Sequence, residues 1–271
     1  MSTVKFKSFS SGSCGNCYFL GVFGDAEPGH RQQCEAGILI DAGVSPRRLK
    51  RELASDGLSY EDFSALLITH DHLDHIRSLG SFCKHVCKPV WATGRLHDAL
   101  SHHFVVGESM PKYRKDLSDG WTEVVPGRIS VHWFEVPHDA SQTVGFAVAL
   151  DGYRYVHITD CGRMTPEALS LCRQADTVTL ESNYDGYMLQ HGPYPVELQN
   201  RIRNGHGHLS NDECAQAIAS FSHEGLRNIF LCHLSEHNNT PELALGASAP
   251  PAGNARLVAL PRQTPSQLFV L

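Results

Sequence analysis

Residues 69–75 read Thr-His-Asp-His-Leu-Asp-His and directly follow a short apolar run that is typical of a buried strand. Four side chains in this heptapeptide can bind a metal ion, namely His70, His72, Asp74 and His75. In an extended turn, positions i and i+2 project the same way, so His70 and His72 are expected to bind one ion. Asp74 and His75 are expected to begin the next helix and face a second ion. Ligands on one helical face would instead recur at i+3 or i+4.

Three further metal-competent residues, His138, Asp160 and His233, each follow a predicted strand. Taken singly, such a residue is more often a capping or hydrogen-bonding group than a ligand. Taken with the heptapeptide, the three predict a site for two ions, with three histidines on one ion, two histidines and an aspartate on the other, and Asp160 able to bridge. Two such ions typically lie about 3.5–4 Å apart and activate one water between them.

Local patterns along the chain alternate strands with helices. Asp151-Gly152 lies between two apolar runs and predicts a hairpin, and Ser45-Pro46 predicts the start of a helix over 46–54. The run 241–255 is rich in Ala, Gly and Pro and predicts a flexible loop. Hairpins and helices in both halves favour α/β layers with mixed sheets. No linker separates two self-sufficient cores, so residues 1–271 are predicted to form one domain.

The composition is that of an ordinary globular protein, with 41% hydrophobic and 19% charged residues. A formal charge of -6 argues against binding nucleic acid through a bulk positive field, so any such contact must be local. The N-terminus lacks the apolar core of a signal peptide, and no apolar run approaches the roughly 20 residues of a membrane span. Nine cysteines are an odd number for a disulfide framework. These features predict a cytoplasmic protein with reduced thiols and no membrane contact.

The metal motif and its downstream partners resemble the metallo-β-lactamase superfamily. Seven further segments resemble its YycJ/WalJ-like branch, and they are 10–17, 40–43, 136–140, 159–162, 180–185, 207–211 and 233–238. The resemblance extends over about residues 5–240. It implies a metallo-β-lactamase-type αββα four-layer sandwich with two mixed β-sheets. It also implies phosphodiester hydrolysis, with a 5′-to-3′ exonuclease action on double-stranded DNA. A chain of 271 residues leaves no room for an inserted β-CASP domain of the ribonuclease J kind.

The ligand set contains imidazoles and carboxylates but no thiolate, which suits two zinc or manganese ions, with iron also allowed. Such ions would lower the pKa of a bound water to about 7 and so supply the attacking hydroxide, which Asp74 would also orient. His208 in a glycine-rich turn and Glu181 at a strand end resemble the Glu–His pair of ribonuclease Z, where the histidine is placed to protonate the leaving oxygen. The alternative is that His208 only hydrogen-bonds across its turn.

Asp41 ends a buried apolar run, and we expect it to accept the second N–H of a ligating histidine. The alternative is that it supplies negative charge to the helix that follows Ser45. Four residues are predicted to contact the substrate, with DNA favoured, and they are Asn183, Arg201, Arg203 and Ser210.

Three other functions stay open at this point. They are an RNA-directed phosphodiesterase, a thioester or lactam hydrolase on the same scaffold, and a non-catalytic scaffold protein. The last is disfavoured because such a protein has no need for seven intact ligand candidates. The stretch 93–123 and the pair Cys14 and Cys17 carry no assigned function.

Overall fold

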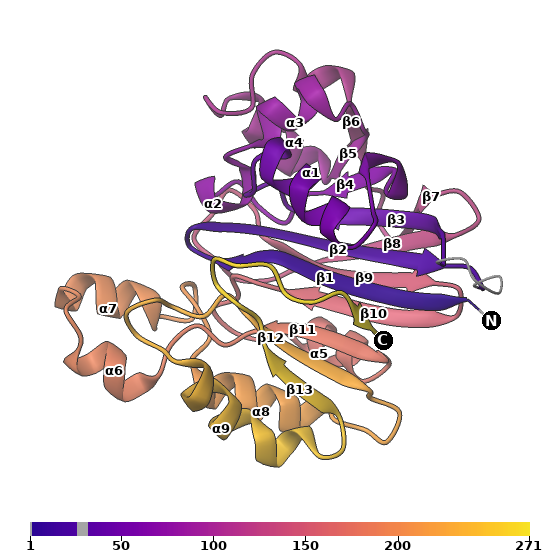
Figure 1. Ribbon diagram of the computed structural model, residues 1–271. Helices are drawn as coiled ribbons and strands as arrows, with labels where there is room; N and C mark the ends of the chain where they lie inside the picture. The colour runs from indigo at the N-terminus through magenta and orange to yellow at the C-terminus, as the bar shows by residue number, and fades with distance from the viewer. Residues whose placement is uncertain (1, 26–31) are drawn as a thin grey trace.

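A computed structural model describes residues 2–25 and 32–271. Two seven-stranded sheets pack face to face, and helices cover the outer face of each (Figure 1). The strand orders are β14-β1-β2-β3-β4-β5-β6 and β13-β12-β11-β10-β9-β8-β7. This arrangement confirms the predicted αββα sandwich with two mixed sheets.

The first sheet comes from the N-terminal part of the chain, and its seventh strand is the C-terminal one. The elements of this half are β1 (Thr3–Gly12), β2 (Gly15–Phe23), β3 (Cys34–Ile40), α1 (Pro46–Ser55), η1 (Tyr60–Asp62), β4 (Ala65–Leu67), α2 (Leu73–Ile76), α3 (Leu79–His85), β5 (Val90–Ala92), α4 (Gly94–Ser101), η2 (Met110–Lys112), β6 (Arg114–Asp116) and β14 (Phe269–Val270).

The second sheet comes from the remainder of the chain. Its elements are β7 (Trp121–Val125), β8 (Ile129–Glu135), β9 (Val144–Leu150), β10 (Tyr153–Ile158), α5 (Pro166–Cys172), β11 (Thr177–Glu181), α6 (Gly186–His191), α7 (Val196–Ile202), α8 (Asn211–Phe221), β12 (Asn228–Cys232), α9 (Pro241–Ala252) and β13 (Arg256–Ala259). The hairpin predicted at Asp151-Gly152 joins β9 to β10, and the helix predicted over 46–54 is α1.

The period-2 alternation of side chains builds the layers. In β2, Tyr18 and Leu20 belong to the core between the sheets, whereas Phe19 packs under the outer helices. The inner core closes with contacts across the sandwich, such as Phe6 against Phe230, whose ring centroids lie 4.7 Å apart. Burying one such phenylalanine contributes about 1.5–3 kcal/mol. Because this core takes residues from both sheets, we propose that the chain is one domain.

Each sheet is antiparallel at one end and parallel at the other. In the first sheet β3, β4, β5 and β6 run parallel, and in the second sheet β10, β11, β12 and β13 do. The carboxyl ends of parallel strands meet at one edge of a sheet, which is where ligands bind in open α/β sheets. The predicted metal ligands follow strands of these two parallel halves, apart from His138.

The prediction of a flexible loop over 241–255 is wrong, because α9 occupies Pro241–Ala252. The hydroxyl of Thr240 caps the helix by accepting from Leu243 N, and Pro241 takes the first helical position, where no N–H is needed. Ala244 and Ala252 are buried, and the helix packs on α8. Alanine-rich composition therefore marked a packed helix, and Pro250 and Pro251 fall only in its last turn.

All nine cysteines lie within the described ranges and are free thiols. Across residues 2–25 and 32–271, every helix is too short or too polar to cross a lipid bilayer.

Candidate metal centre and active site

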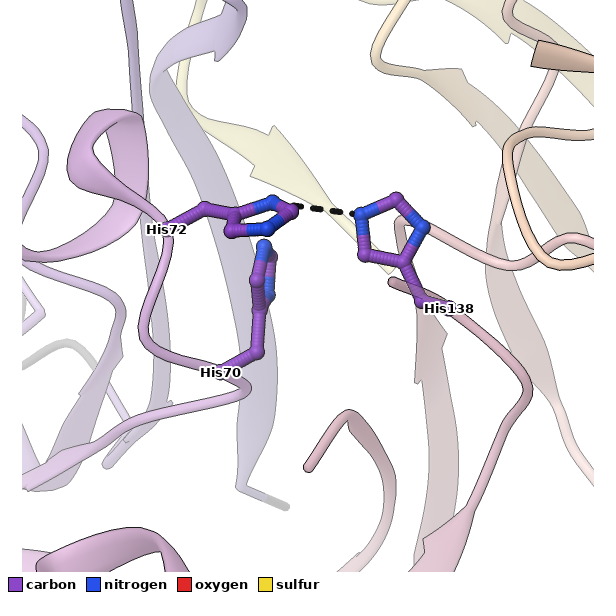
Figure 2. Close-up of side chains that lie close together, drawn as sticks. All are labelled: His70, His72 and His138. Atoms are coloured by element: carbon purple, nitrogen blue, oxygen red, sulfur yellow. Dashed lines mark hydrogen bonds between the residues drawn. The ribbon is translucent and has the colours of Figure 1, made fainter. Parts of the chain in front are cut away.

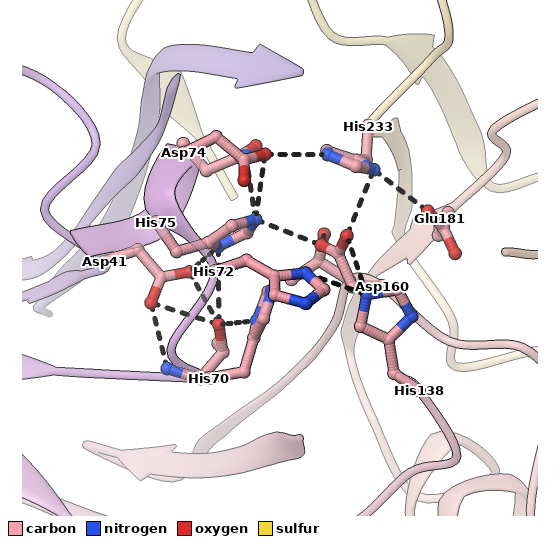
Figure 3. A network of polar contacts seen from close by, with 12 residues as sticks. Asp41, His70, His72, Asp74, His75, His138, Asp160, Glu181 and His233 are labelled. Carbon is pink, nitrogen blue, oxygen red and sulfur yellow. Dashed lines mark hydrogen bonds and ion pairs between the residues drawn. The ribbon is translucent and has the colours of Figure 1, made fainter. Parts of the chain in front are cut away.

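Three of the predicted site residues follow strands and hold a left-handed backbone. Asp41 follows β3, Asp160 lies two residues beyond β10, and His233 follows β12, with φ angles of 62°, 49° and 54°. This conformation costs a non-glycine residue roughly 1–2 kcal/mol, so surrounding contacts must impose it. The Asp41 amide donates to Leu67 O at 2.8 Å, and the His233 amide donates to Ser11 Oγ at 3.0 Å. These turns direct the three side chains into one polar cluster (Figure 3).

The first ligand group consists of His70, His72 and His138 (Figure 2). His72 Nδ1 and His138 Nε2 lie 3.2 Å apart. His138 Nδ1 donates to the Gly207 carbonyl at 2.6 Å, which leaves the lone pair on Nε2. Burial lowers the pKa of His70 and of His138, so both imidazoles are held neutral, the form that binds a metal ion.

The surroundings of His70 indicate that this group of histidines fits a cation. Its side chain is buried, and its Nδ1 lies 3.0 Å from Thr69 Oγ1. Its Nε2 has no hydrogen-bond partner among the described residues. A buried polar atom without a partner costs about 1–3 kcal/mol, and a metal ion bound to the three histidines would remove that cost. The donor set therefore fits a divalent cation.

The second ligand group consists of Asp74, His75 and His233 (Figure 3). Asp74 Oδ2 lies 3.5 Å from His75 Nε2 and 3.4 Å from His233 Nε2. Burial by itself lowers the pKa of His75, but the carboxylates of Asp41, Asp160 and Asp74 outweigh it and raise that pKa to about 10. The group therefore attracts positive charge, and a metal ion bound there must displace the proton.

Asp160 lies between the two groups. Its Oδ2 is 3.1 Å from His75 Nε2, and its Oδ1 is 3.7 Å from His138 Nε2. The structure thus brings all seven predicted ligands together, with Asp160 where a bridging carboxylate would be needed.

Asp41 is fully buried, and its carboxylate contacts His75. Its Oδ2 accepts from His75 Nδ1 at 2.6 Å, and the same carboxylate accepts from Thr69 N at 2.9 Å and from Thr69 Oγ1 at 2.8 Å. This geometry directs His75 Nε2 toward Asp74 and Asp160.

Glu181 ends β11 and holds two histidines on one carboxylate. Its Oε1 lies 2.8 Å from His208 Nδ1 and 3.0 Å from His233 Nδ1, and its Oε2 accepts from Leu209 N at 3.1 Å. Burial lowers the pKa of His208, but the charge of Glu181 and its hydrogen bond outweigh this and raise that pKa. His208 can therefore carry a proton. Glu181 and His208 also form a possible ligand group with Asp160 and His233.

A cavity of about 260 Å³ opens onto the two groups and is lined by His72, His208 and His233. Of the predicted substrate contacts, Asn183 and Arg201 line it. Asn183 Nδ2 also donates to the His233 carbonyl at 2.8 Å, and Arg201 Nε donates to Asp139.

The other two predicted substrate contacts are Arg203 and Ser210, and neither is among the described residues that line this cavity. The exposed Arg203 donates to Asn200 Oδ1 in its own helix at 2.6 Å. The Ser210 hydroxyl accepts from Glu213 N at 3.1 Å and donates to the Glu213 carboxylate at 2.7 Å, so it caps α8. The spacing Ser-x-x-Glu is the sequence signature of such a capping box.

Sequence reasoning missed two side chains of this centre. Asn16 is a buried residue of β2, with its Nδ2 3.1 Å from Asp74 Oδ2 and its Oδ1 accepting from Tyr18 Oη at 3.1 Å. Asp139 follows His138, and its Oδ1 lies 3.5 Å from His138 Nε2. Asn16 was part of the quoted segment 10–17, but its distance in sequence from the metal motif hid the contact.

Comparison with known proteins identifies the family of the chain. The sequence model of the beta-lactamase superfamily domain matches residues 37–233. The chain is 31% identical to exodeoxyribonuclease YycJ of Bacillus anthracis over 89% of this chain and 86% of that protein. It is 30% identical to exodeoxyribonuclease WalJ of Streptococcus pneumoniae (strain D39), covering 90% of this chain and 87% of that protein.

Among solved structures, the chain resembles the metallo-beta-lactamase fold protein YhfI from Bacillus subtilis. The TM-score is 0.69, and the alignment covers 98% of this chain and 99% of that chain. At 13% identity this likeness supports the fold alone.

Replacing Asp41 by Asn should weaken metal binding about 10–100-fold, because the acceptor that orients His75 loses its charge. Asparagine tolerates a left-handed backbone, so the turn itself is retained. The measurement is competition for the metal against a chromophoric chelator. Asp151→Asn is the matched control, since Asp151 also has a positive φ, of 47°, in the hairpin turn between β9 and β10. Equal metal affinity in the two variants would show that Asp41 does not support a ligand.

Proposed function

The chain belongs to the beta-lactamase superfamily and is a metal-dependent hydrolase, and on that premise we propose that it is a dinuclear nuclease, a 5′-to-3′ exonuclease on double-stranded DNA. The observation that carries the proposal is His208, held by Glu181 on the wall of a cavity that one residue of each ligand group, His72 and His233, also lines. A phosphodiester bond needs an acid there, because its leaving group is a sugar alkoxide. Two relatives of the chain are exodeoxyribonucleases, which supports DNA as the substrate.

The proposed ligands are His70, His72 and His138 for one ion and Asp74, His75 and His233 for the other, with Asp160 shared. Zinc, manganese or iron bound there would supply Lewis acidity that polarises the phosphodiester and acidifies water. The thiol next to Asp160 in the chain is otherwise engaged, since Cys161 Sγ lies 3.0 Å from the Arg163 carbonyl. Because all nine thiols are free, we further propose that the enzyme acts in the cytoplasm.

Other side chains of the protein orient the ligands, hold the proton and bind the phosphate. Asn16 donates to Asp74 Oδ2, and in this way restricts which lone pairs of Asp74 can bind an ion or orient a water. Glu181 engages His208 Nδ1, so the proton available to a substrate is the one on Nε2. That proton passes to the departing oxygen. Arg201, next to the same cavity, offers a cation to a phosphate.

The metal-loaded protein should shorten a 5′-phosphorylated DNA duplex from its 5′ ends. The assay compares this duplex with single-stranded DNA, with RNA of the same sequence and with a chromogenic lactam, alongside metal analysis of the purified protein. Fast lactam cleavage with intact DNA would identify a hydrolase of the alternative class. Faster cleavage of RNA than of DNA would identify an RNA-directed phosphodiesterase.

His208→Ala should lower kcat on DNA by about 10²–10⁴-fold while the metal content stays at the wild-type value. The loss should be much smaller on bis(4-nitrophenyl) phosphate, because nitrophenolate leaves without a proton. His206→Ala is the matched control, since His206 is an exposed histidine in the same turn. Loss of metal from the His208 variant would instead make His208 a ligand, and undiminished turnover on DNA would rule out the acid role.

Arg201→Ala should weaken DNA binding and reduce the slope of log K against log salt by about 1, because one phosphate contact is lost. Arg203→Ala removes the same charge two residues away, outside the lining of the cavity, and should leave the slope unchanged. The slopes are measured by titrating labelled duplex at several salt concentrations. Identical slopes for the two variants would show that neither arginine contacts phosphate.

A further inference from the structure

One part of the cavity lining comes from α7 and the turn before it. Tyr194, Leu198 and Ile202 line this wall together with Arg201. The three apolar side chains belong to a small cluster with Tyr184 and Leu189, separate from the three large cores of the sandwich. In Figure 1, α6 and α7 project from the body of the molecule at the left. This cluster stabilises the cavity wall rather than the sandwich.

The wall is fixed relative to the proposed catalytic groups. Gln199 is 7% exposed and its Nε2 donates to the Tyr194 carbonyl at 2.9 Å, which holds the turn before α7. At the other end of α7, the His208 amide donates to the Ile202 carbonyl at 2.9 Å. The ion pair between Arg201 and Asp139 joins α7 to the loop that carries His138. Tyr194 is therefore held at a set place with respect to His208 and the first ligand group.

The chemistry of this wall is that of a nucleotide site. Tyr194, Leu198 and Ile202 give the cavity an aromatic ring and two aliphatic side chains, and Arg201 beside them offers a planar cation that matches phosphate. Base stacking on aromatic side chains is tolerant of sequence, as a nuclease that degrades DNA requires. An acyl chain would match the apolar surface but would offer no anion to the guanidinium.

We propose that Tyr194, Leu198 and Ile202 form the platform on which the nucleobase adjacent to the scissile phosphodiester stacks, with Arg201 on the neighbouring phosphate. This inference rests on the proposed function, since it names the part of the substrate that occupies the cavity. Tyr194 is a specificity-determining residue in this view, and it takes no part in bond cleavage.

The test compares substrates as well as variants. Duplexes carrying a tetrahydrofuran abasic nucleotide on either side of the scissile bond are compared with the intact duplex, and bis(4-nitrophenyl) phosphate reports whether the centre cleaves a phosphodiester at all. In the wild type, removing the stacked base should lower kcat/KM by about tenfold or more. Tyr194→Leu should lower kcat/KM on intact DNA by a similar factor, abolish the difference between the intact and abasic duplexes, and leave the metal content at the wild-type value. Tyr194→Phe should behave as the wild type.

Tyr187→Leu is the matched control, because Tyr187 is an exposed tyrosine on α6 of the same projection, outside the cavity lining. A wild type that cleaves abasic and intact duplexes equally well overturns the proposal, even if the Tyr194 variant fails to fold. So does a Tyr194→Leu variant that keeps full activity on DNA. A wild type that cleaves neither DNA nor the nitrophenyl diester refutes the proposed function instead, so the two failures are distinguishable.

Discussion

One edge of the sandwich buries three carboxylates, those of Asp41, Asp160 and Glu181. Their negative charge determines which partners the surrounding side chains must supply. A buried charge is tolerated only when it is paired and hydrogen-bonded. Each carboxylate accordingly faces one or more histidines, and Asp41 and Glu181 also accept backbone N–H groups. The raised pKa of His75 shows the same constraint, because its protonated form offsets the neighbouring negative charge. A divalent cation would satisfy these groups more completely than protons do.

The constraint also explains why the site depends on the whole fold. The residues from 70 to 75 come from the first sheet, whereas His138, Asp160 and His233 come from the second. The two sets meet only because the inner core, with pairs such as Phe6 and Phe230, holds the sheets face to face. Ser11 shows the coupling directly, since this residue of β1 accepts from the backbone of His233 across the sandwich. Packing energy therefore offsets the cost of assembling like charges at the shared edge.

The sequence predicted features that are local or periodic. The four-ligand heptapeptide, the hairpin at Asp151-Gly152 and the mixed α/β layers are recognisable from spacing and alternation, whereas the four-layer sandwich followed from the family resemblance. The helix at 241–252 departs from the predicted loop, because the Ala-, Gly- and Pro-rich composition masks the capping signal Thr240-Pro241-Glu242. Features that depend on distant segments were out of reach. Arg201 and Arg203 look equivalent in sequence, and only the orientation of α7 brings one of them to the cavity.

The net charge of -6 bears on how such a protein binds a polyanion. In the proposed assignment, Asp41, Asp74, Asp160 and Glu181 contribute four negative charges, which two divalent ions neutralise. Arg201 is already paired with Asp139, so it orients a bound phosphate more than it adds net positive charge. Without the ions, protonated histidines such as His75 offset part of this negative charge; with them, the local field favours phosphate more strongly. Metal and nucleic acid should therefore favour each other's binding, and by linkage to the same extent. A local centre of this kind lets an acidic protein bind DNA without a basic surface.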